Sequence, residues 1–374
     1  MICESSKLGD RLGWMGNQAG VSLGIVNYNG VSHLPPLREA VRALEGEFDE
    51  LLILDNASTD ASLAWIDENW PEARVLRLEK NQGPGPARNA LLEASPSPLL
   101  LLMDNDARPE PGVLRELLEV RRLSGNPAVV QSRVVFADEP QKIHYDGAHL
   151  HYVGLPLLRN FHQRLRPEEE RFVEVDSFQA VCLLVDSKPL LEVGGFDPHF
   201  FFYFEDSDLS HRLRLLGERI VVAQKALTRH GDGTAGLSQR GSSYSKKRIY
   251  LHSRNRSLLV LKTYRLRSLF LLAPGALPFE FAGFALACQK GHPWAWFKGR
   301  LALVPLLPSI LRARKELARL SRARKHPLRD RPLLRADPFT FLPSLQTSAL
   351  ARGLQKTLSQ LCALWWRLVS PLLP

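Results

Sequence analysis

The 374-residue sequence contains few cysteines, and their spacing excludes the sites that cysteine usually builds. The four thiols (Cys3, Cys182, Cys288 and Cys362) lie far apart, so no pair has the short spacing of a zinc site. They also lack the closely spaced pattern of the disulfide-rich small secreted domains. This pattern is typical of reduced thiols, and we therefore expect a cytoplasmic protein.

The N-terminus lacks a long apolar run. Polar and charged residues are spread through the first 20 positions, without the apolar core of a secretory signal. We therefore expect no signal peptide and predict that residues 1–20 form an N-terminal extension.

Acidic residues are scarce in the last third of the chain. Residues 240–374 contain 25 Lys and Arg but only four Asp and Glu, a balance of +21, whereas residues 1–239 contain 24 basic and 35 acidic residues. Such a tail predicts an anionic partner, either a membrane surface or a nucleic acid. Because the tail is rich in Leu and Trp and contains no recognisable nucleic-acid module, we favour the membrane and expect no nucleic acid.

The rest of the composition is that of a globular protein, with 45% hydrophobic and 24% charged residues. Short apolar runs alternate with segments of helical periodicity. Strands are predicted at 21–26, 51–54, 75–78 and 99–103. Helices are predicted at 34–44, from a Thr59 or Asp60 cap to about 69, and from a turn at 83–86 through 92. This alternation predicts an α/β fold with a Rossmann-like, mostly parallel sheet.

Polar side chains follow three of these strands. Asn27 and Asn29 come after the first, Asp55 after the second, and Asp104 and Asp106 after the fourth. The carboxyl ends of parallel strands share one edge of a sheet, where ligands collect. Two carboxylates there suit a divalent cation carrying a phosphorylated substrate. Turn and helix-cap roles remain the alternative for each position taken singly.

The region 129–175 is predicted to be irregular. Its four histidines (His144, His149, His151 and His162) have no common ligand spacing and are interpreted as solvated or core residues. Beyond it, a strand is predicted at 180–185 and a helix at 205–216.

That helix begins with an acidic cluster. Asp208 is interpreted as a helix-capping residue, because acidic groups favour the positive end of a helix dipole. The aromatic run 200–204 would place Glu205 and Asp206 in a low dielectric. Such a setting raises a carboxyl pKa towards that of a useful general base.

Six linked motifs cover residues 21–235: VSLGIVNYNG, LLILDNASTD, NQGPGPARNALL, LLLLMDNDARPEPGVL, EVGGFDPHFFFYFEDSDLSHRLRLLG and TRHGDGT. Their order resembles that of family 2 inverting glycosyltransferases of the GT-A fold, a nucleotide-diphospho-sugar transferase fold. The bacterial rhamnosyltransferase-like branch is the most similar. One departure is Ala180-Val181-Cys182, where the family has a Gly- or Ala-rich segment on the acceptor side.

The resemblance implies a role for each matching residue. Asp206 would be the catalytic base, with Glu205 supporting it or contacting the acceptor. Asp106 would bind a divalent metal (Mg²⁺ or Mn²⁺), with His230 as a further ligand and Asp104 as a ribose-binding or supporting group. The nucleotide and its diphosphate would be held by Asn27, Tyr28, Asn29, Asp55, Asn56, Gly85, Arg88 and Asn89.

The implied reaction moves a sugar from a nucleotide donor to a lipid-linked or polysaccharide acceptor in cell-envelope glycan synthesis. The branch favours dTDP-rhamnose, with a UDP-sugar as the alternative donor. A sugar nucleotidyltransferase is a competing interpretation, but it would leave Asp206 without a role and usually has a Gly-rich phosphate loop with a lysine. A third interpretation is a non-enzymatic protein that binds membranes or nucleic acid through its tail.

The resemblance places the catalytic domain at 21–262 and leaves 263–374 as a basic, amphipathic helical tail. The apolar stretch 269–287 is long enough for a membrane span, but Pro274, Pro278 and Glu280 argue against one. Tryptophans beside basic residues at 294–300, and a Leu stripe backed by Arg at 303–322, favour an in-plane anchor. We therefore expect a peripheral protein on the inner face of the plasma membrane. A helical layer packed on the catalytic domain, with a solvated basic face, is the alternative.

Overall fold

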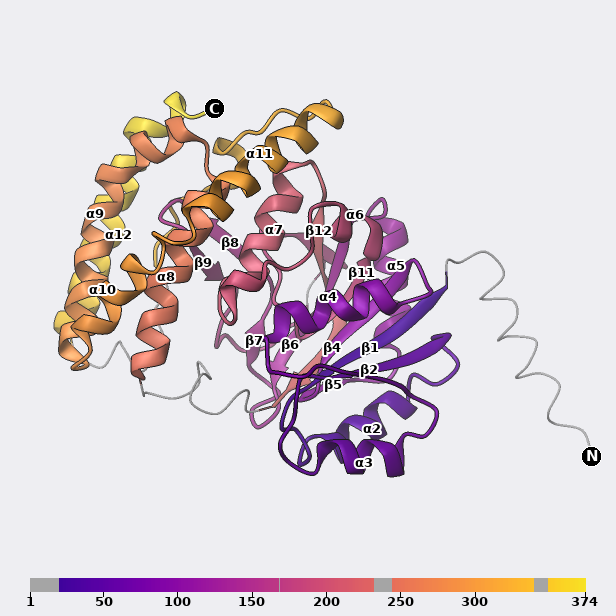
Figure 1. Cartoon of the computed structure of the whole chain (residues 1–374). Coiled ribbons are helices and arrows are strands. Elements are labelled where there is room, and N and C mark those ends of the chain that lie inside the picture. The colour runs from indigo at the N-terminus through magenta and orange to yellow at the C-terminus, as the bar shows by residue number, and fades with distance from the viewer. Residues whose placement is uncertain (1–19, 168, 232–243, 340–348) are drawn as a thin grey trace, which may run out of the picture.

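A computed structural model describes residues 20–167, 169–231, 244–339 and 349–374 (Figure 1). The predicted N-terminal extension, except for Gly20, and the end of the TRHGDGT motif lie outside these ranges. Within them, ten strands form one mixed sheet. From one edge its main path runs through β3 (Arg74–Arg77), β2 (Glu50–Asp55), β1 (Val21–Asn27), β4 (Leu99–Asp104), β11 (Cys182–Asp186), β6 (Val129–Phe136), β12 (Ile220–His230) and β10 (Phe172–Glu174).

The strands β3, β2, β1 and β4 are parallel, which confirms the α/β fold with a mostly parallel sheet. Their register pairs Asn27 with Asp55 and Val26 with Asp104, so the polar ends of these strands share one edge. β11 is antiparallel to both of its neighbours, β4 and β6, and β12 is parallel to β6. Two short strands extend the sheet, β5 (Ala107–Pro109) beside β12 and β7 (Ile143–Tyr145) beside β6.

Helices cover both faces of this sheet because side chains of its strands alternate between two cores. Leu23 and Ile25 of β1 pack with α2 (Leu34–Arg42), α3 (Ser62–Asn69) and α5 (Val113–Leu123). Val26 belongs to the opposite core, with α4 (Pro84–Ala94), α6 (Ser187–Glu192) and α7 (Glu205–Leu215). Figure 1 shows α4 and α7 on one side of the sheet and α2 and α3 on the other.

The prediction of an irregular 129–175 region is wrong. β6 lies in the middle of the sheet and is buried along all eight residues. The polar residues at the centre of β6 interrupt its apolar run, so the sequence pattern does not indicate a strand. They can be buried because Gln131 accepts a hydrogen bond from Gln179 N and Arg133 pairs with buried Asp146. A separate hairpin, β8 (Ala148–His151) and β9 (Leu155–Leu158), follows it.

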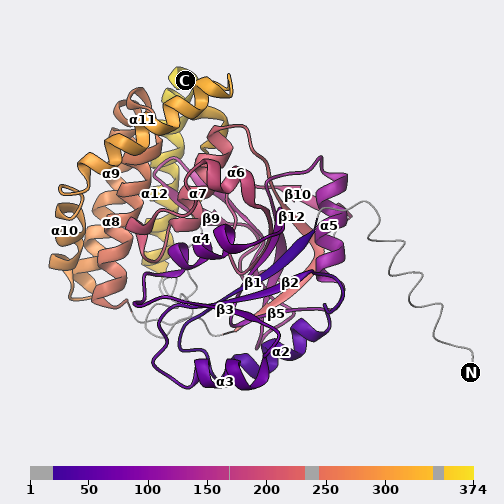
Figure 2. The same ribbon diagram turned by 45° about the vertical axis from the view of Figure 1, so that its right-hand side comes forward.

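Helices dominate the C-terminal part, as predicted: α8 (Lys246–Thr263), α9 (Leu266–Gln289), α10 (Pro293–Leu301), α11 (Leu307–Ala323) and α12 (Ala349–Val369). They form a layer beside the sheet (Figures 1 and 2). Tyr152, Phe200, Tyr264 and Cys362 lie in one buried cluster that joins this layer to the rest of the molecule. The domain boundary at 262 stays a prediction.

The two prolines do not interrupt α9, which continues through both for 24 residues. Proline removes a backbone donor, and neighbouring side chains satisfy carbonyls that a proline leaves exposed. In α9, side chains from outside the helix bond two carbonyls near the prolines: Trp365 donates to Leu271 O at 2.9 Å and Tyr152 donates to Gly275 O at 3.0 Å. By length and composition alone, α9 is the one helix among the described residues that is long and apolar enough to cross a membrane.

Candidate active site

A cavity of about 1120 Å³ lies between the carboxyl edge of the sheet and the C-terminal helices. Its walls come from the loops after β1, β2 and β4, the start of α4 and α7, the end of β12, and the helices α8, α9 and α10. This volume exceeds that of most small-molecule sites and is large enough for two substrates together.

Of the residues predicted to bind the nucleotide, Tyr28, Asn29 and Asn56 line the cavity, as do Arg88 and Asp104. The Asn29 side chain accepts a hydrogen bond from Thr59 N at 2.8 Å, and Asn56 donates to Gly83 O at 3.1 Å. These contacts connect the loops after β1 and β2 with the start of α4.

The other four predicted residues are not among those that line the cavity. Asn27 donates to Asp55 at 2.9 Å, and Asp55 accepts from Ser58 Oγ at 2.6 Å. These side chains therefore stabilise the loops after β1 and β2 without lining the cavity. Asn89 exchanges hydrogen bonds with the backbone of Phe196, at 2.8 and 2.7 Å. Gly85 packs on the same residue, since a Cβ there would lie 3.1 Å from Phe196 Cβ. A direct contact of these four with a nucleotide stays a prediction.

Asp104, Asp106 and His230 form a cluster whose ligand atoms lie within 4.8 Å of one another. The pairing of β5 with β12 explains this arrangement, because it sets His230 opposite Ala107, next to Asp106. His230 Nε2 lies 3.2 Å from Asp106 Oδ1. Two hard carboxylates and an imidazole fit Mg²⁺ or Mn²⁺.

His144 touches this cluster, although it was not predicted to belong to the site. It is buried, as expected of a core histidine, and its Nδ1 lies 3.1 Å from His230 Nδ1. A hydrogen bond to the second ring nitrogen orients a metal-binding histidine, so His144 is placed to position His230. No sequence spacing signals this contact, because the residues belong to β7 and β12.

Arg88 connects the cluster to the predicted acidic pair. Its buried guanidinium donates to Asp104 and to Ala180 O, both at 2.8 Å, and to Asp206 Oδ1 at 3.4 Å. Burial opposes the charge of Arg88, but the surrounding carboxylates outweigh burial and raise its pKa. Burial and the neighbouring Asp106 also raise the pKa of Asp104, against the effect of Arg88.

Glu205 and Asp206 open α7, and they differ in their contacts. Asp206 Oδ2 accepts a hydrogen bond from Ala180 N at 3.0 Å, and Arg88 contacts its other oxygen. Glu205 Oε2 is buried without a hydrogen-bond partner. Burial and the charge of Asp206 raise the pKa of Glu205 to about 8, and burial also raises that of Asp206, where Arg88 opposes it. Asp206 is therefore the better stabilised carboxylate, and Glu205 is the partner that retains a proton.

The capping role predicted for Asp208 is wrong. Its side chain is fully buried and accepts hydrogen bonds from Arg212 at 2.8 Å and Lys262 at 2.9 Å, and no side chain caps α7. This charge holds α7 to α8 instead.

The loop that leads into the acidic pair is strained. Phe201, Tyr203 and Phe204 have φ angles of 61°, 67° and 69°, in the region that residues with a Cβ rarely occupy. Two residues of α8 hold it. Asn255 Nδ2 lies 2.8–2.9 Å from the carbonyl oxygens of Phe200, Phe202 and Tyr203, and Arg254 donates to His199 O and Phe200 O.

The comparison with known families agrees with this geometry. Residues 22–182 match the family model described as Glycosyl transferase family 2. This part of the chain is a glycosyltransferase family 2 domain. The matched range includes Asp104 and Asp106 but ends before Glu205, Asp206 and His230.

Two curated relatives match parts of the chain. The chain is 29% identical over 113 residues to "Succinoglycan biosynthesis protein ExoO" of Rhizobium meliloti (strain 1021), covering 30% of this chain and 32% of that protein. It is 40% identical over 77 residues to "Succinoglycan biosynthesis protein ExoU" of the same organism, covering 20% and 22%. The matches therefore span about a third and about a fifth of the relatives' lengths.

Solved structures share the fold. GalNAc-T7 with UDP, GalNAc and Mn²⁺ superposes with a TM-score of 0.52 at 14% identity, over 70% of this chain and 51% of that one. S. aureus TarS 1–349 in complex with UDP has a TM-score of 0.50 at 17% identity, over 82% and 90%. The family 2 domain thus has the GT-A fold, as its motifs led us to expect.

Proposed function

We propose that this chain is an inverting, metal-dependent glycosyltransferase. One observation carries the proposal: a metal-type cluster and a buried acidic pair face the same cavity, and Arg88 connects them. The family 2 domain supports a transferase that uses a nucleotide sugar.

The cluster would serve the donor. A divalent cation held by Asp106 and His230, with Asp104 beside them, would offset the charge that develops on a leaving nucleoside diphosphate. One oxygen of Asp104 is already engaged by Arg88, which supports its predicted role as a supporting group. Tyr28, Asn29 and Asn56, at the same edge of the sheet, are placed to contact the nucleoside.

Asp206 would serve the acceptor. Its carboxylate takes the proton of the acceptor hydroxyl while the hydroxyl oxygen attacks the anomeric carbon and the bond to the diphosphate breaks. A single displacement of this kind inverts the anomeric centre. Ala180 N and Arg88 keep Asp206 oriented and ionised, and a protonated Glu205 avoids a second negative charge beside it.

For the substrates, we infer transfer to a lipid-linked or polysaccharide acceptor in cell-envelope glycan synthesis. The names of the two succinoglycan biosynthesis relatives support a polysaccharide product. The rhamnosyltransferase-like motifs favour dTDP-rhamnose as donor. A UDP-sugar is the alternative donor, because two solved structures of the same fold contain UDP.

A donor screen tests this proposal. The full chain is incubated with Mn²⁺ and a panel of dTDP- and UDP-sugars, and release of free nucleoside diphosphate is followed with and without a membrane extract as acceptor source. We expect one donor to be turned over, faster with the extract. Pyrophosphate formation from a nucleoside triphosphate and a sugar phosphate would instead identify a nucleotidyltransferase and overturn the proposal.

For its location, we propose a peripheral position on the cytoplasmic face of the plasma membrane. The basic balance of residues 240–374 and the exposed apolar side chains of α9, which include Phe270 and Phe281, support it.

A further inference from the structure

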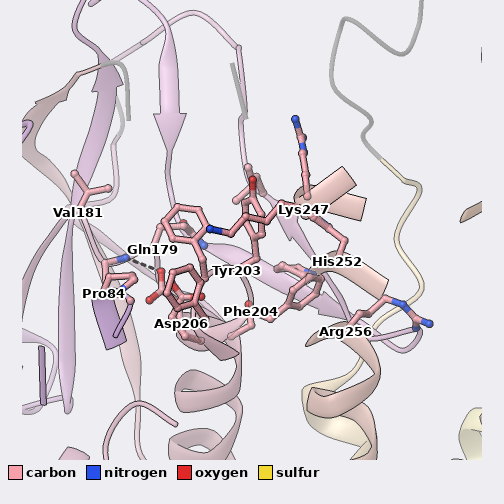
Figure 3. A pocket seen from close by; sticks show the side chains of 18 of the residues that line it. Pro84, Gln179, Val181, Tyr203, Phe204, Asp206, Lys247, His252 and Arg256 are labelled. Carbon is pink, nitrogen blue, oxygen red and sulfur yellow. Dashed lines mark hydrogen bonds between the residues drawn. The ribbon is translucent and has the colours of Figure 1, made fainter. Parts of the chain in front are cut away.

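The cavity continues well beyond the acidic pair. Figure 3 shows Asp206 between two groups of residues: Pro84, at the start of α4, and Val181, just before β11, lie on one side, and Lys247 and His252 of α8 lie on the other. Further along, α9 and α10 complete the walls. The donor-side cluster accounts for none of these residues.

This far part of the cavity is basic. Among the described lining residues of α8, α9 and α10, Lys247, Arg248, Arg256 and Arg300 are positive and Glu280 alone is negative. Glu280 is held by both Arg256 and Arg300. Among the described residues, Arg248 forms no ion pair with any carboxylate, although Glu205 and Asp206 line the same cavity.

Arg248 is 2% exposed, and its Nε and Nη1 are buried without hydrogen-bond partners. Its guanidinium stacks on the ring of Tyr244 at 4.1 Å, which orients it but uses none of its N–H donors. Burying an unpaired charge is costly, so a buried arginine of this kind is normally paired. An anion that enters the cavity would supply the missing partner.

Arg248 and Tyr203 also line the same cavity as Glu205 and Asp206. Burial raises the pKa of the Tyr203 hydroxyl to about 12, and the charges of Arg248 and Glu205 act on it in opposite directions. Tyr203 therefore lies within electrostatic range of both. An anion held by Arg248 would sit on the acceptor side of Asp206, away from the Asp104–Asp106–His230 cluster.

Apolar surface surrounds the basic part. Phe279, Leu286 and Trp296 line the same cavity, and the opposite side of α9 exposes Phe270 by 81% and Phe281 by 70%. A free phosphate ion would explain the arginine but not this apolar wall. A phosphate with a hydrocarbon chain explains both, because the chain would contact the apolar wall of the cavity.

We propose that Arg248, with Lys247 beside it, binds the phosphate of a lipid-linked acceptor whose hydrocarbon chain follows α9. This inference rests on the proposed function, since it identifies the acceptor of that reaction as a glycan linked to a lipid phosphate. It adds a binding site in which none of the predicted site residues takes part.

The test is direct binding to the full chain, without donor and with EDTA present, so that neither turnover nor a metal contributes. The probes are farnesyl phosphate, farnesol and inorganic phosphate. We expect farnesyl phosphate to bind at least about tenfold more tightly than either control probe. Arg248→Gln should remove about tenfold of that affinity and leave farnesol binding unchanged.

Lys246→Gln is the matched control, because Lys246 is exposed on the same turn of α8 and does not line the cavity. It should bind all probes as the wild type does, and Arg248→Lys should recover part of the loss if Arg248→Gln folds poorly. Equal losses in Lys246→Gln and Arg248→Gln, or no loss in the latter, would overturn the proposal. Inorganic phosphate binding as tightly as farnesyl phosphate would overturn its lipid part.

Failure here leaves the glycosyl transfer proposal standing, because the donor screen does not depend on Arg248. Conversely, intact farnesyl phosphate binding in a chain that turns over no nucleotide sugar would overturn the proposed reaction alone.

Discussion

At the scale of single residues, the site depends on one buried arginine among carboxylates. Arg88 reaches Asp104 at 2.8 Å and Asp206 at 3.4 Å, so one cation stabilises groups on both the donor and the acceptor side. It also explains why the two acidic residues that open α7 are not equivalent, since the hydrogen bond from Arg88 goes to Asp206 and not to Glu205.

This difference predicts opposite results for two isosteric substitutions. Asp206→Asn should lower kcat by about 10²–10⁴-fold, because an amide cannot take the acceptor's proton, whereas donor affinity should change little. Glu205→Gln imitates the protonated form that burial favours and should cost only about threefold. The measurements are nucleoside diphosphate release and donor binding.

The pH dependence provides a second readout of Asp206. Because burial raises its pKa, the wild-type rate should fall as the pH drops through that raised pKa and the carboxylate takes up a proton. Equal losses in the two variants, or a parallel loss of donor binding in Asp206→Asn, would show that Asp206 is structural.

The metal cluster gives the next prediction at this scale. Asp106→Ala should weaken Mn²⁺ binding by about 10–100-fold, while Asp104→Asn should weaken it less, since Arg88 already occupies one oxygen of Asp104. Titration calorimetry with Mn²⁺ measures both. Asp67→Asn, at an exposed ion pair with Arg77, is the control. Unchanged Mn²⁺ affinity in Asp106→Ala would remove Asp106 from the ligand set.

At the scale of helices and strands, the regular first half of the sheet was predictable and the second half was not. Each of the four parallel strands contains a short apolar run, and β4 begins at its predicted start. β6 escaped prediction because Gln131, Ser132 and Arg133 interrupt its apolar run, and burial of these polar groups depends on partners distant in sequence.

The same limit applies to the site. Asp104, Asp106 and Asp206 follow from local motifs, but the contact of His230 with Asp106 depends on the pairing of β5 with β12. The sequence also did not predict that three further residues lie behind the cavity wall: Asn27, Asp55 and Asn89. A motif at the end of a strand does not determine the direction of its side chains.

The loop before α7 carries a prediction of its own. Its positive φ angles are maintained by Asn255, so Asn255→Ala should let the loop relax and displace Asp206. We expect a loss of about 1–3 kcal/mol in unfolding free energy, together with a fall in kcat that exceeds any change in donor KM.

Asn69→Ala is the matched truncation, because Asn69 also donates to a carbonyl, that of Trp65, but lies on α3. It should leave kcat unchanged. A loss of stability in Asn255→Ala without a fall in kcat would mean that the loop geometry does not matter for the reaction.

At the scale of the whole molecule, charge and apolar surface are segregated. The basic balance lies in residues 240–374, and most residues of α9 are not buried. Glu280 would oppose contact between α9 and lipid, but Arg256 and Arg300 bind it from within the protein. The carboxylate of Glu280 is therefore neutralised within the protein and does not prevent the apolar outer side of α9 from contacting lipid.

This arrangement predicts binding of the full chain to lipid vesicles that contain an anionic lipid. Binding should weaken with salt, because the basic tail contributes electrostatically, and should fall about tenfold with Phe270→Ser or Phe281→Ser, which remove exposed apolar area. Leu123→Ser is the control, since Leu123 is 46% exposed but lies on α5, outside the tail. Vesicle sedimentation across the three variants, with phosphatidylglycerol or only phosphatidylcholine, measures each effect. Equal partitioning of all three variants and the wild type would show that α9 does not contact the lipid, and the basic, apolar tail would then be only a helical layer packed on the catalytic domain.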